Sequence, residues 1–293
     1  ADAQSIARRI EEKLAEIRGA DMLPEELIAL VERVIPLQLA ARQNAKVAVP
    51  EAGACATDAA MFAGSPMLLR ESFPYDEAQA LELFGVFLAM LAEVGGEAAK
   101  SAATLNAALA SGELKPVEVL RALISGNEET FVAWRAKLPG TPRALDFLAV
   151  CSLWPSLSAT AQALAPRLPE NLPHDHGHCP LCGSLPYISL LRQKEGLRFG
   201  VCSFCGHEHR IRRIACPYCD EADQNKLKLF QVKEFPGVRV DVCTTCNMYV
   251  KTVDHRELDG EPLPALDDMA TLALDVLALN QGFKRPTLSA WGF

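Results

Sequence analysis

Apolar residues in the first 170 positions recur at helical spacing. Ile6, Ile10 and Leu14 lie four residues apart, and Phe84 and Leu88 continue the same pattern further along the chain. This period places apolar side chains on one face of a helix. Glycine and proline residues punctuate the series, so we predict seven or eight helices whose short connections favour antiparallel neighbours.

Some helix boundaries can be placed. Asp76 is a suitable N-cap for a helix over 77–94. Pro36 is predicted to kink or end the helix that begins near Pro24, because proline removes a backbone donor and clashes with the preceding turn. Residues 51–75 are the least regular part of this half and are expected to form a long loop.

The pattern changes near residue 171. Residues 165–178 carry prolines and histidines, His174 among them, and are predicted to be a linker. Beyond it, β-branched and aromatic residues alternate with polar ones, which is typical of strands. One hairpin is predicted over 186–201, with its turn at 194–196, and a second over 227–242.

A last helix is predicted after the second hairpin. Met269, Leu272, Val276 and Leu279 give it one apolar face. Asp267 and Asp268 stand near its start, where carboxylates cap free amides and favour the positive end of the helix dipole. A surface for a partner protein is the alternative role for these two residues.

The cysteines define the chemistry of the second half. Eight of the ten lie between residues 179 and 246, in four Cys-x-x-Cys pairs: Cys179/Cys182, Cys202/Cys205, Cys216/Cys219 and Cys243/Cys246. Each pair can aim two thiolates at one ion, provided that the residue after the second cysteine accepts a positive φ. Those residues are of the types that tolerate it best, namely Gly183, Gly206, Asp220 and Asn247.

The spacing indicates how the four pairs combine. Nineteen residues separate Cys182 from Cys202 and twenty-three separate Cys219 from Cys243, and each gap holds a hairpin. We call each Cys-x-x-Cys pair with its tight turn a knuckle. A unit of knuckle, hairpin and knuckle therefore occurs twice. We predict sequential sites, with Cys179, Cys182, Cys202 and Cys205 on one ion and Cys216, Cys219, Cys243 and Cys246 on another. An interleaved cross-brace is the alternative.

The cysteines could also serve other chemistry. A thioredoxin-like redox pair, a set of disulfides and iron–sulfur clusters remain alternatives to mononuclear sites. Four thiolates suit either zinc or iron, and they leave no position for water or substrate. No Ser-His-Asp pattern, phosphate-binding loop or His-Glu-x-x-His motif accompanies them, so we expect no enzyme and no catalytic or organic-cofactor residues.

The remaining candidates have ordinary explanations. Cys55 and Cys151 lie outside any reactive motif and are expected to be buried or half-buried thiols. The histidines beside the knuckles, His178, His207 and His209, are expected to be solvated or hydrogen-bonded near sulfur. The basic stretch 210–213 is expected to be a solvated strand face, with contact to a phosphate or an acidic partner as the alternative.

Taken together, these patterns predict an α+β protein. It comprises an all-α helical domain over 1–170, a four-cysteine β-hairpin module of zinc-ribbon type over 171–212, a second such module over 213–255, and a C-terminal helix and tail over 256–293.

The net charge of the chain limits the classes of partner that we expect it to bind. The formal net charge is −8, and residues 171–293 carry 14 basic and 15 acidic groups. A protein that binds mainly nucleic acid or anionic membrane needs clustered basic residues, so we expect neither partner.

The chain shows no membrane-spanning or export segment by its sequence pattern. The longest apolar run, Leu83–Ala92, is too short to span a membrane, and Arg8-Arg9 is followed by acidic residues rather than an apolar export segment. A cytoplasmic location follows.

At this point the residues resemble a known family, the FdhE type of formate dehydrogenase accessory protein. The match covers residues 179–275: Cys179-Pro-Leu-Cys-Gly183, Gly196-Leu-Arg198 ahead of the second pair, Tyr249 and Lys251 after the fourth pair, and the acidic, leucine-rich segment Leu266–Asp275.

This resemblance implies a helical domain followed by two rubredoxin-like metal modules that hold two mononuclear ions, iron or zinc. It also implies a chaperone-like cytoplasmic factor that matures formate dehydrogenase by contacting its catalytic subunit. Two alternatives stay open: a rubredoxin-like electron carrier or redox sensor, and a zinc-ribbon nucleic-acid-binding protein.

Overall fold

The computed structural model describes residues 3–173, 175–258 and 261–293, so His174 of the predicted linker lies outside the described residues. The fold is α+β, as predicted: eight α-helices precede a six-stranded sheet in the described chain, and two more helices follow it. Two compact units are formed, each from separate stretches of sequence. We call them the helical unit (Pro24–Pro50, Leu69–Ala163 and Ala290–Phe293) and the cysteine unit (the chain up to Leu23, Glu51–Leu68 and Leu164–Ser289).

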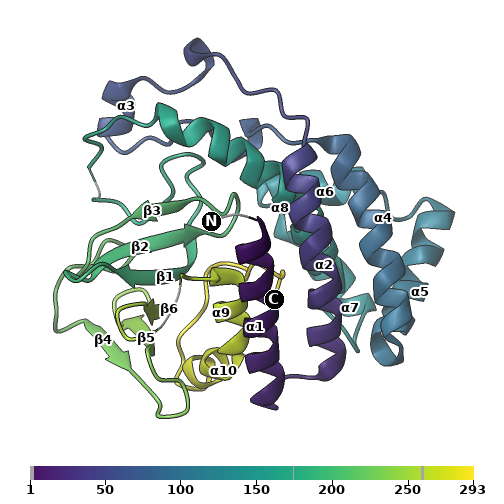
Figure 1. The fold of residues 1–293 in the computed structure, drawn as a ribbon. Coiled ribbons are helices and arrows are strands. Elements are labelled where there is room, and N and C mark those ends of the chain that lie inside the picture. Colours follow the sequence, from purple (N-terminus) through teal and green to yellow (C-terminus); the bar gives the residue numbers. More distant parts are fainter. Residues whose placement is uncertain (1–2, 174, 259–260) are drawn as a thin grey trace. The chain divides into compact units, whose positions relative to one another are not determined.

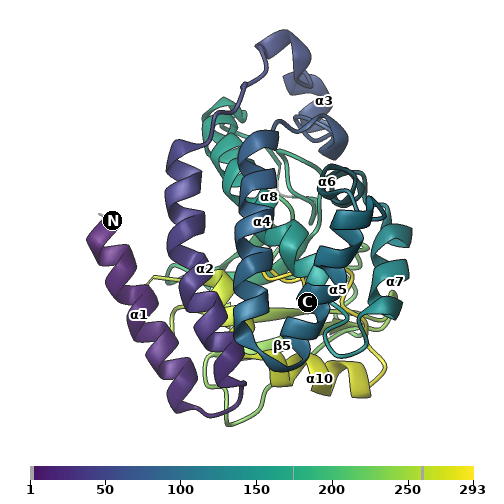
Figure 2. The ribbon, with the colours of Figure 1, turned by 90° about the vertical axis from the view of Figure 1, so that its right-hand side faces the viewer.

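The helical unit is a bundle with an apolar core. Its helices are α2 (Glu25–Asn44), α4 (Glu77–Val94), α5 (Gly96–Ser111), α6 (Pro116–Ser125), α7 (Glu128–Lys137) and α8 (Ala144–Leu164). Figure 2 shows α2, α4 and α5 side by side. Asp76 caps α4 by accepting a hydrogen bond from the amide of Gln79 at 3.1 Å, and Phe84 and Phe87 of α4 are fully buried.

Two predictions in this half need correction. The helix that starts near Pro24 continues through Pro36 to Asn44, so Pro36 does not end it. Residues 51–75 hold two 3₁₀ turns and the short helix α3 (Asp58–Phe62), which the Thr57 hydroxyl caps, rather than an unbroken loop. Periodicity cannot reveal a five-residue helix, because it completes little more than one turn.

Helix α8 is the core of the helical unit. Residues Ala144–Arg167 form the one described helical segment that is long and apolar enough to cross a membrane, and 89% of its most apolar window is buried inside the structure. Burial of this kind is typical of a core helix, so the length and composition of α8 do not indicate a membrane span.

The cysteine unit is built on one sheet (Figure 1). Its strands are β1 (Pro186–Arg192), β2 (Leu197–Cys202), β3 (Glu208–Arg210), β4 (Leu227–Phe230), β5 (Val238–Cys243) and β6 (Met248–Asp254), in the order β3-β2-β1-β6-β5-β4. The two predicted hairpins are β1–β2 and β4–β5, and β3 and β6 each follow the second knuckle of a module. Parallel pairing of β1 with β6, from Ile188 opposite Lys251 onward, joins the two modules.

In the described residues, four α-helices complete the cysteine unit: α1 (Ala3–Gly19), the short α3, α9 (Pro264–Ala270) and α10 (Leu272–Asn280). The predicted single apolar face of the last helix is wrong beyond Met269. The helix breaks at Thr271, which changes the phase, so Leu274 and Ala278 are buried while Val276 and Leu279 are exposed.

Candidate metal centres

Each cysteine pair is held in a tight turn. The amide of the residue after the second cysteine donates to the carbonyl of the first, as from Gly183 to Cys179 at 2.8 Å and from Asp220 to Cys216 at 3.1 Å. This closure requires a left-handed residue. The structure confirms it in all four turns: φ is 74° at Gly183, 70° at Gly206, 58° at Asp220 and 57° at Asn247.

The first four-thiol group consists of Cys179, Cys182, Cys202 and Cys205, and all four are buried. Sulfur–sulfur distances are 3.8 Å from Cys179 to Cys205, 3.4 Å from Cys182 to Cys202 and 3.7 Å from Cys182 to Cys205. The amide of Phe204 points at the Cys202 sulfur at 3.4 Å. Amide donors of this kind stabilise a thiolate.

The second four-thiol group consists of Cys216, Cys219, Cys243 and Cys246. The sulfurs of Cys216 and Cys246 lie 3.7 Å apart, and so do those of Cys219 and Cys243. This group is more open than the first, because Cys219 is exposed and Cys246 is only half-buried. The grouping is the sequential one, not the interleaved cross-brace.

The donor sets fit a tetrahedral ion. Four sulfurs at about 2.3 Å from a central metal lie about 3.8 Å from one another, close to the separations in both groups. Burial raises the pKa of the Cys179 and Cys205 thiols well above the ordinary value. A cation at the centre of the group reverses that preference and favours the thiolates. The two groups are therefore consistent with two metal ions.

The other predicted candidates lie around these groups without joining them. His178 Nε2 lies 2.9 Å from the carbonyl oxygen of Gly64, and His209 Nε2 lies 3.1 Å from that of Gly177. Burial lowers the pKa of His207 to about 4, so this imidazole is neutral at pH 7. Among the described residues, the side chains that gather in metal-binding geometry are the eight cysteines alone.

The remaining cysteines have the surroundings predicted for them. Cys151 is fully buried and Cys55 is half-buried, and neither belongs to a group. In the stretch 210–213, Ile211 is buried while the three arginines are exposed. The exposure of these arginines is as predicted, but β3 ends at Arg210, so residues 211–213 are not part of a strand.

A segment distant in sequence supports the first group. The amide of Met67 donates to the carbonyl of Pro180 at 2.8 Å, and the amide of Leu68 donates to that of Leu181 at 3.0 Å. Residues 67 and 68 thus pair with the backbone between Cys179 and Cys182. Nothing in the sequence marks this contact, since backbone pairing of an irregular segment leaves no side-chain pattern.

A buried charge cluster, which we call the lysine cluster, joins the sheet to the C-terminal helices. Lys251 Nζ of β6 lies 2.8 Å from Asp268 Oδ1 and 2.6 Å from Asp275 Oδ2, and Arg285 Nη2 lies 2.8 Å from Asp268 Oδ2. The Tyr249 hydroxyl donates to Asp275 at 2.7 Å. Burial alone would raise the pKa of Asp268, but the charges of Lys251 and Arg285 outweigh it and hold that pKa below its ordinary value.

This cluster corrects the predicted role of the two aspartates. Asp267 does act near the helix start, accepting the amide of Leu263 at 3.0 Å. Asp268 is instead fully buried and pairs with two cations, Lys251 of β6 and Arg285, which follows α10. The signal available in the sequence was Lys251 in the middle of a predominantly apolar strand, since a lysine that is buried needs a carboxylate partner.

The fold and the two groups define a class: an α+β protein whose six-stranded sheet carries two metal-binding sites of four cysteines each. Comparison with known protein families agrees with this class. The profile described as "FdhE, central domain" matches residues 178–213, and "FdhE, C-terminal domain" matches residues 202–290. Residues 178–290 of the chain, which hold both four-thiol groups, therefore match the FdhE family.

Individual relatives support this assignment. A protein named FdhE homolog from Haemophilus influenzae is 31% identical over 195 residues, which span 62% of this chain and 64% of the relative. An FdhE homolog from Aquifex aeolicus is 34% identical over 40% of this chain and 42% of the relative. The chain thus aligns with less than two thirds of the length of these relatives.

A solved structure shows that the fold extends over nearly the whole chain. The crystal structure of the FdhE protein from Pseudomonas aeruginosa matches 97% of this chain and 94% of its own, with a TM-score of 0.63 and 24% sequence identity. The likeness in fold therefore includes the helical unit, which lies outside the residues that the family profiles match.

Proposed function

We propose that the chain is a cytoplasmic accessory factor for the maturation of formate dehydrogenase. In this proposal it contacts the catalytic subunit, and its eight grouped cysteines hold two metal ions. The observation that carries the proposal is the FdhE family match over the residues that form both four-thiol groups.

The geometry of the two groups supports a role other than hydrolysis. Four protein sulfurs complete a tetrahedral shell, so no position is left where water or substrate could be activated. A bound ion would tie the two knuckles of each module together and contribute to folding free energy. We assign the chain no catalytic turnover of its own and assign the ligand role to the sulfur atoms of all eight cysteines, with iron or zinc as the metal.

A specific observation favours a second candidate, a rubredoxin-like electron carrier. The exposed Cys219 and the half-buried Cys246 bring the edge of the second group to the surface, and electron exchange needs such an approach. This candidate requires iron with a reversible couple. Protein that contains zinc alone after purification without oxygen excludes it.

Co-purification tests the accessory role. The tagged full-length chain is isolated without oxygen from the cytoplasmic fraction of its source organism, and the catalytic subunit of formate dehydrogenase is sought in the eluate. We expect the subunit with the wild-type chain and with the control variant Cys55→Ala. A strain that lacks the chain should have low formate dehydrogenase activity, and normal activity in that strain contradicts the proposal.

A further inference from the structure

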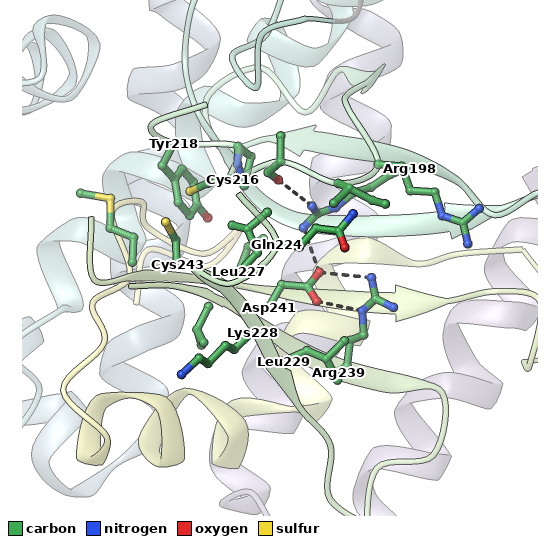
Figure 3. A pocket seen from close by; sticks show the side chains of 17 residues that line it. Arg198, Cys216, Tyr218, Gln224, Leu227, Lys228, Leu229, Arg239, Asp241 and Cys243 are labelled. Atoms are coloured by element: carbon green, nitrogen blue, oxygen red, sulfur yellow. Dashed lines mark hydrogen bonds and ion pairs between the residues drawn. The ribbon is translucent and has the colours of Figure 1, made fainter. Parts of the chain in front are cut away.

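A cavity of about 340 Å³ lies beside the second four-thiol group, within the cysteine unit. Cys216 and Cys243, two members of that group, line it (Figure 3). One face of β5 and β6 contributes the floor, because the strand register places Asp241 opposite Val250 and Cys243 opposite Met248. The segment 213–218, strand β4, Arg198 of β2 and Gln224 contribute the rest of the described lining.

The cavity carries an excess of positive charge. Its described lining includes Arg198, Arg213 and Arg239 together with a single carboxylate, that of Asp241. Asp241 Oδ2 lies 2.9 Å from Arg198 Nη2, and its Oδ1 lies 2.9 Å from Arg239 Nε, so one negative charge is shared by two guanidinium groups (Figure 3). On a chain whose net charge is −8, this is a local positive site.

Arg213 is the cation best placed to meet a ligand. Its side chain is exposed at the cavity, and its Nη1 donates to the carbonyl of Glu195 in the β1–β2 turn. A backbone carbonyl positions a guanidinium without neutralising it. Lys228 also borders the cavity from β4, but Figure 3 shows its side chain directed away from Asp241.

The rim of the cavity is apolar. Ile214 is 55% exposed and Leu229 is 54% exposed, although both are large aliphatic residues. Leu229 belongs to β4, the edge strand of the described sheet. Uncovered aliphatic groups beside fixed guanidinium groups suit an occupant that is both anionic and apolar. A polypeptide segment with acidic and aliphatic side chains has that chemistry.

We propose that this cavity docks an acidic segment of a partner polypeptide. One carboxylate of the segment lies between Arg213 and Arg239, and neighbouring aliphatic side chains cover Ile214 and Leu229. The identity of the partner as the formate dehydrogenase catalytic subunit rests on the proposed function. Because Cys216 and Cys243 share the cavity, the docked segment lies against the second four-thiol group.

A competing explanation for the arginines must be separated from docking. Four thiolates on a divalent ion carry a net charge of −2, and nearby cations could serve to balance it. On that explanation, removal of Arg213 lowers metal content and leaves peptide binding unaffected. Docking predicts the reverse, since Arg213 is held by Glu195 and belongs to neither four-thiol group.

The direct test is fluorescence anisotropy with a labelled eight-residue peptide of alternating valine and glutamate, and with its glutamine counterpart. The metal-loaded full chain should bind the glutamate peptide and not the glutamine one. Arg213→Gln should weaken binding by about tenfold, the effect of one charge-assisted hydrogen bond. The matched controls are Arg212→Gln, the exposed neighbour outside the cavity, and Lys228→Gln, and they should stay within about twofold.

Several results would overturn the docking site. The proposal is wrong if the glutamate peptide does not bind, or if both peptides bind equally. It is also wrong if Arg213→Gln and Arg212→Gln weaken peptide binding equally, or if Arg213→Gln loses metal. Co-purification separates this proposal from the proposed function. If the catalytic subunit co-purifies equally with wild type and Arg213→Gln, the docking site is wrong and the function stands. If the peptide binds as expected but the subunit never co-purifies, the function fails and the docking site stands.

Discussion

At the scale of single residues, the knuckle turns depend on four left-handed positions, and two of them are not glycine. Asp220 and Asn247 adopt φ values of 58° and 57°. Their short polar side chains make this conformation less costly than it is for other residues with a Cβ. Because each closes a turn that aims two sulfurs at one point, backbone strain there bears directly on the metal site.

Substitution at Asn247 tests this dependence. Asn247→Gly should leave the free energy of unfolding unchanged or slightly higher, while Asn247→Ala should lower it by about 1 kcal/mol, because alanine pays a steric cost at positive φ. Urea unfolding of the metal-loaded variants measures both values. Equal stability of the two variants would show that the turn does not require the left-handed conformation.

The two four-thiol groups also differ in the exposure of their sulfurs. All four cysteines of the first group are buried, whereas Cys219 of the second is exposed and Cys246 is half-buried. We expect a chelator to remove one ion quickly and the other slowly, because it can reach the second group directly. Metal release followed over time in wild type and in Cys216→Ala checks this. The fast phase should be absent from Cys216→Ala, and its persistence there would reverse the assignment.

At the scale of elements, the two modules share one sheet. β1 and β6 pair in parallel, and the hydroxyls of Ser189 and Thr252 lie 2.6 Å apart across that junction. The hairpins themselves could be predicted from alternation and turn residues, and the ligand grouping followed from spacing. The pairing of β1 with β6 could not be predicted, because strands of either module could have paired elsewhere. Their side-chain patterns do not specify a partner strand.

The lysine cluster ties this sheet to α9, α10 and the tail. Lys251 is 1% exposed and Asp268 is fully buried. Lys251→Met should lower the free energy of unfolding by about 3–5 kcal/mol, because among the described residues it leaves Asp268 and Asp275 with Arg285 as their one remaining cation. Chemical denaturation gives the value, with the exposed Lys233→Met as the control. A loss no larger than that of the control would mean that the cluster contributes little to stability.

At the scale of the whole molecule, neither compact unit is continuous in sequence. α1 and residues 51–68 belong with the cysteines, and Lys13 of α1 lies 3.4 Å from Asp267 of α9. Composition changes near residue 171 and led to a predicted boundary there. Such a change cannot reveal which early segments join the later unit, because these contacts are long-range and their residues also suit a helical bundle.

The predicted boundary after residue 170 stays a prediction, and a fragment of residues 171–293 tests it. The fragment retains both four-thiol groups but lacks α1 and the pairing of Met67 and Leu68 with the first knuckle. We expect it to bind two ions and to unfold at lower urea than the cysteine unit of the full chain. Equal midpoints would show that the fragment is an independent domain and that the early segments add no stability.

The central claim is that eight cysteines hold two ions in sequential groups. Native mass spectrometry of the full chain purified without oxygen tests it most directly. We predict two metal ions, iron or zinc, on wild type and on Cys55→Ala, and one ion each on Cys179→Ala and Cys216→Ala. A wild-type chain without two ions, or either knuckle variant with two, would contradict the account.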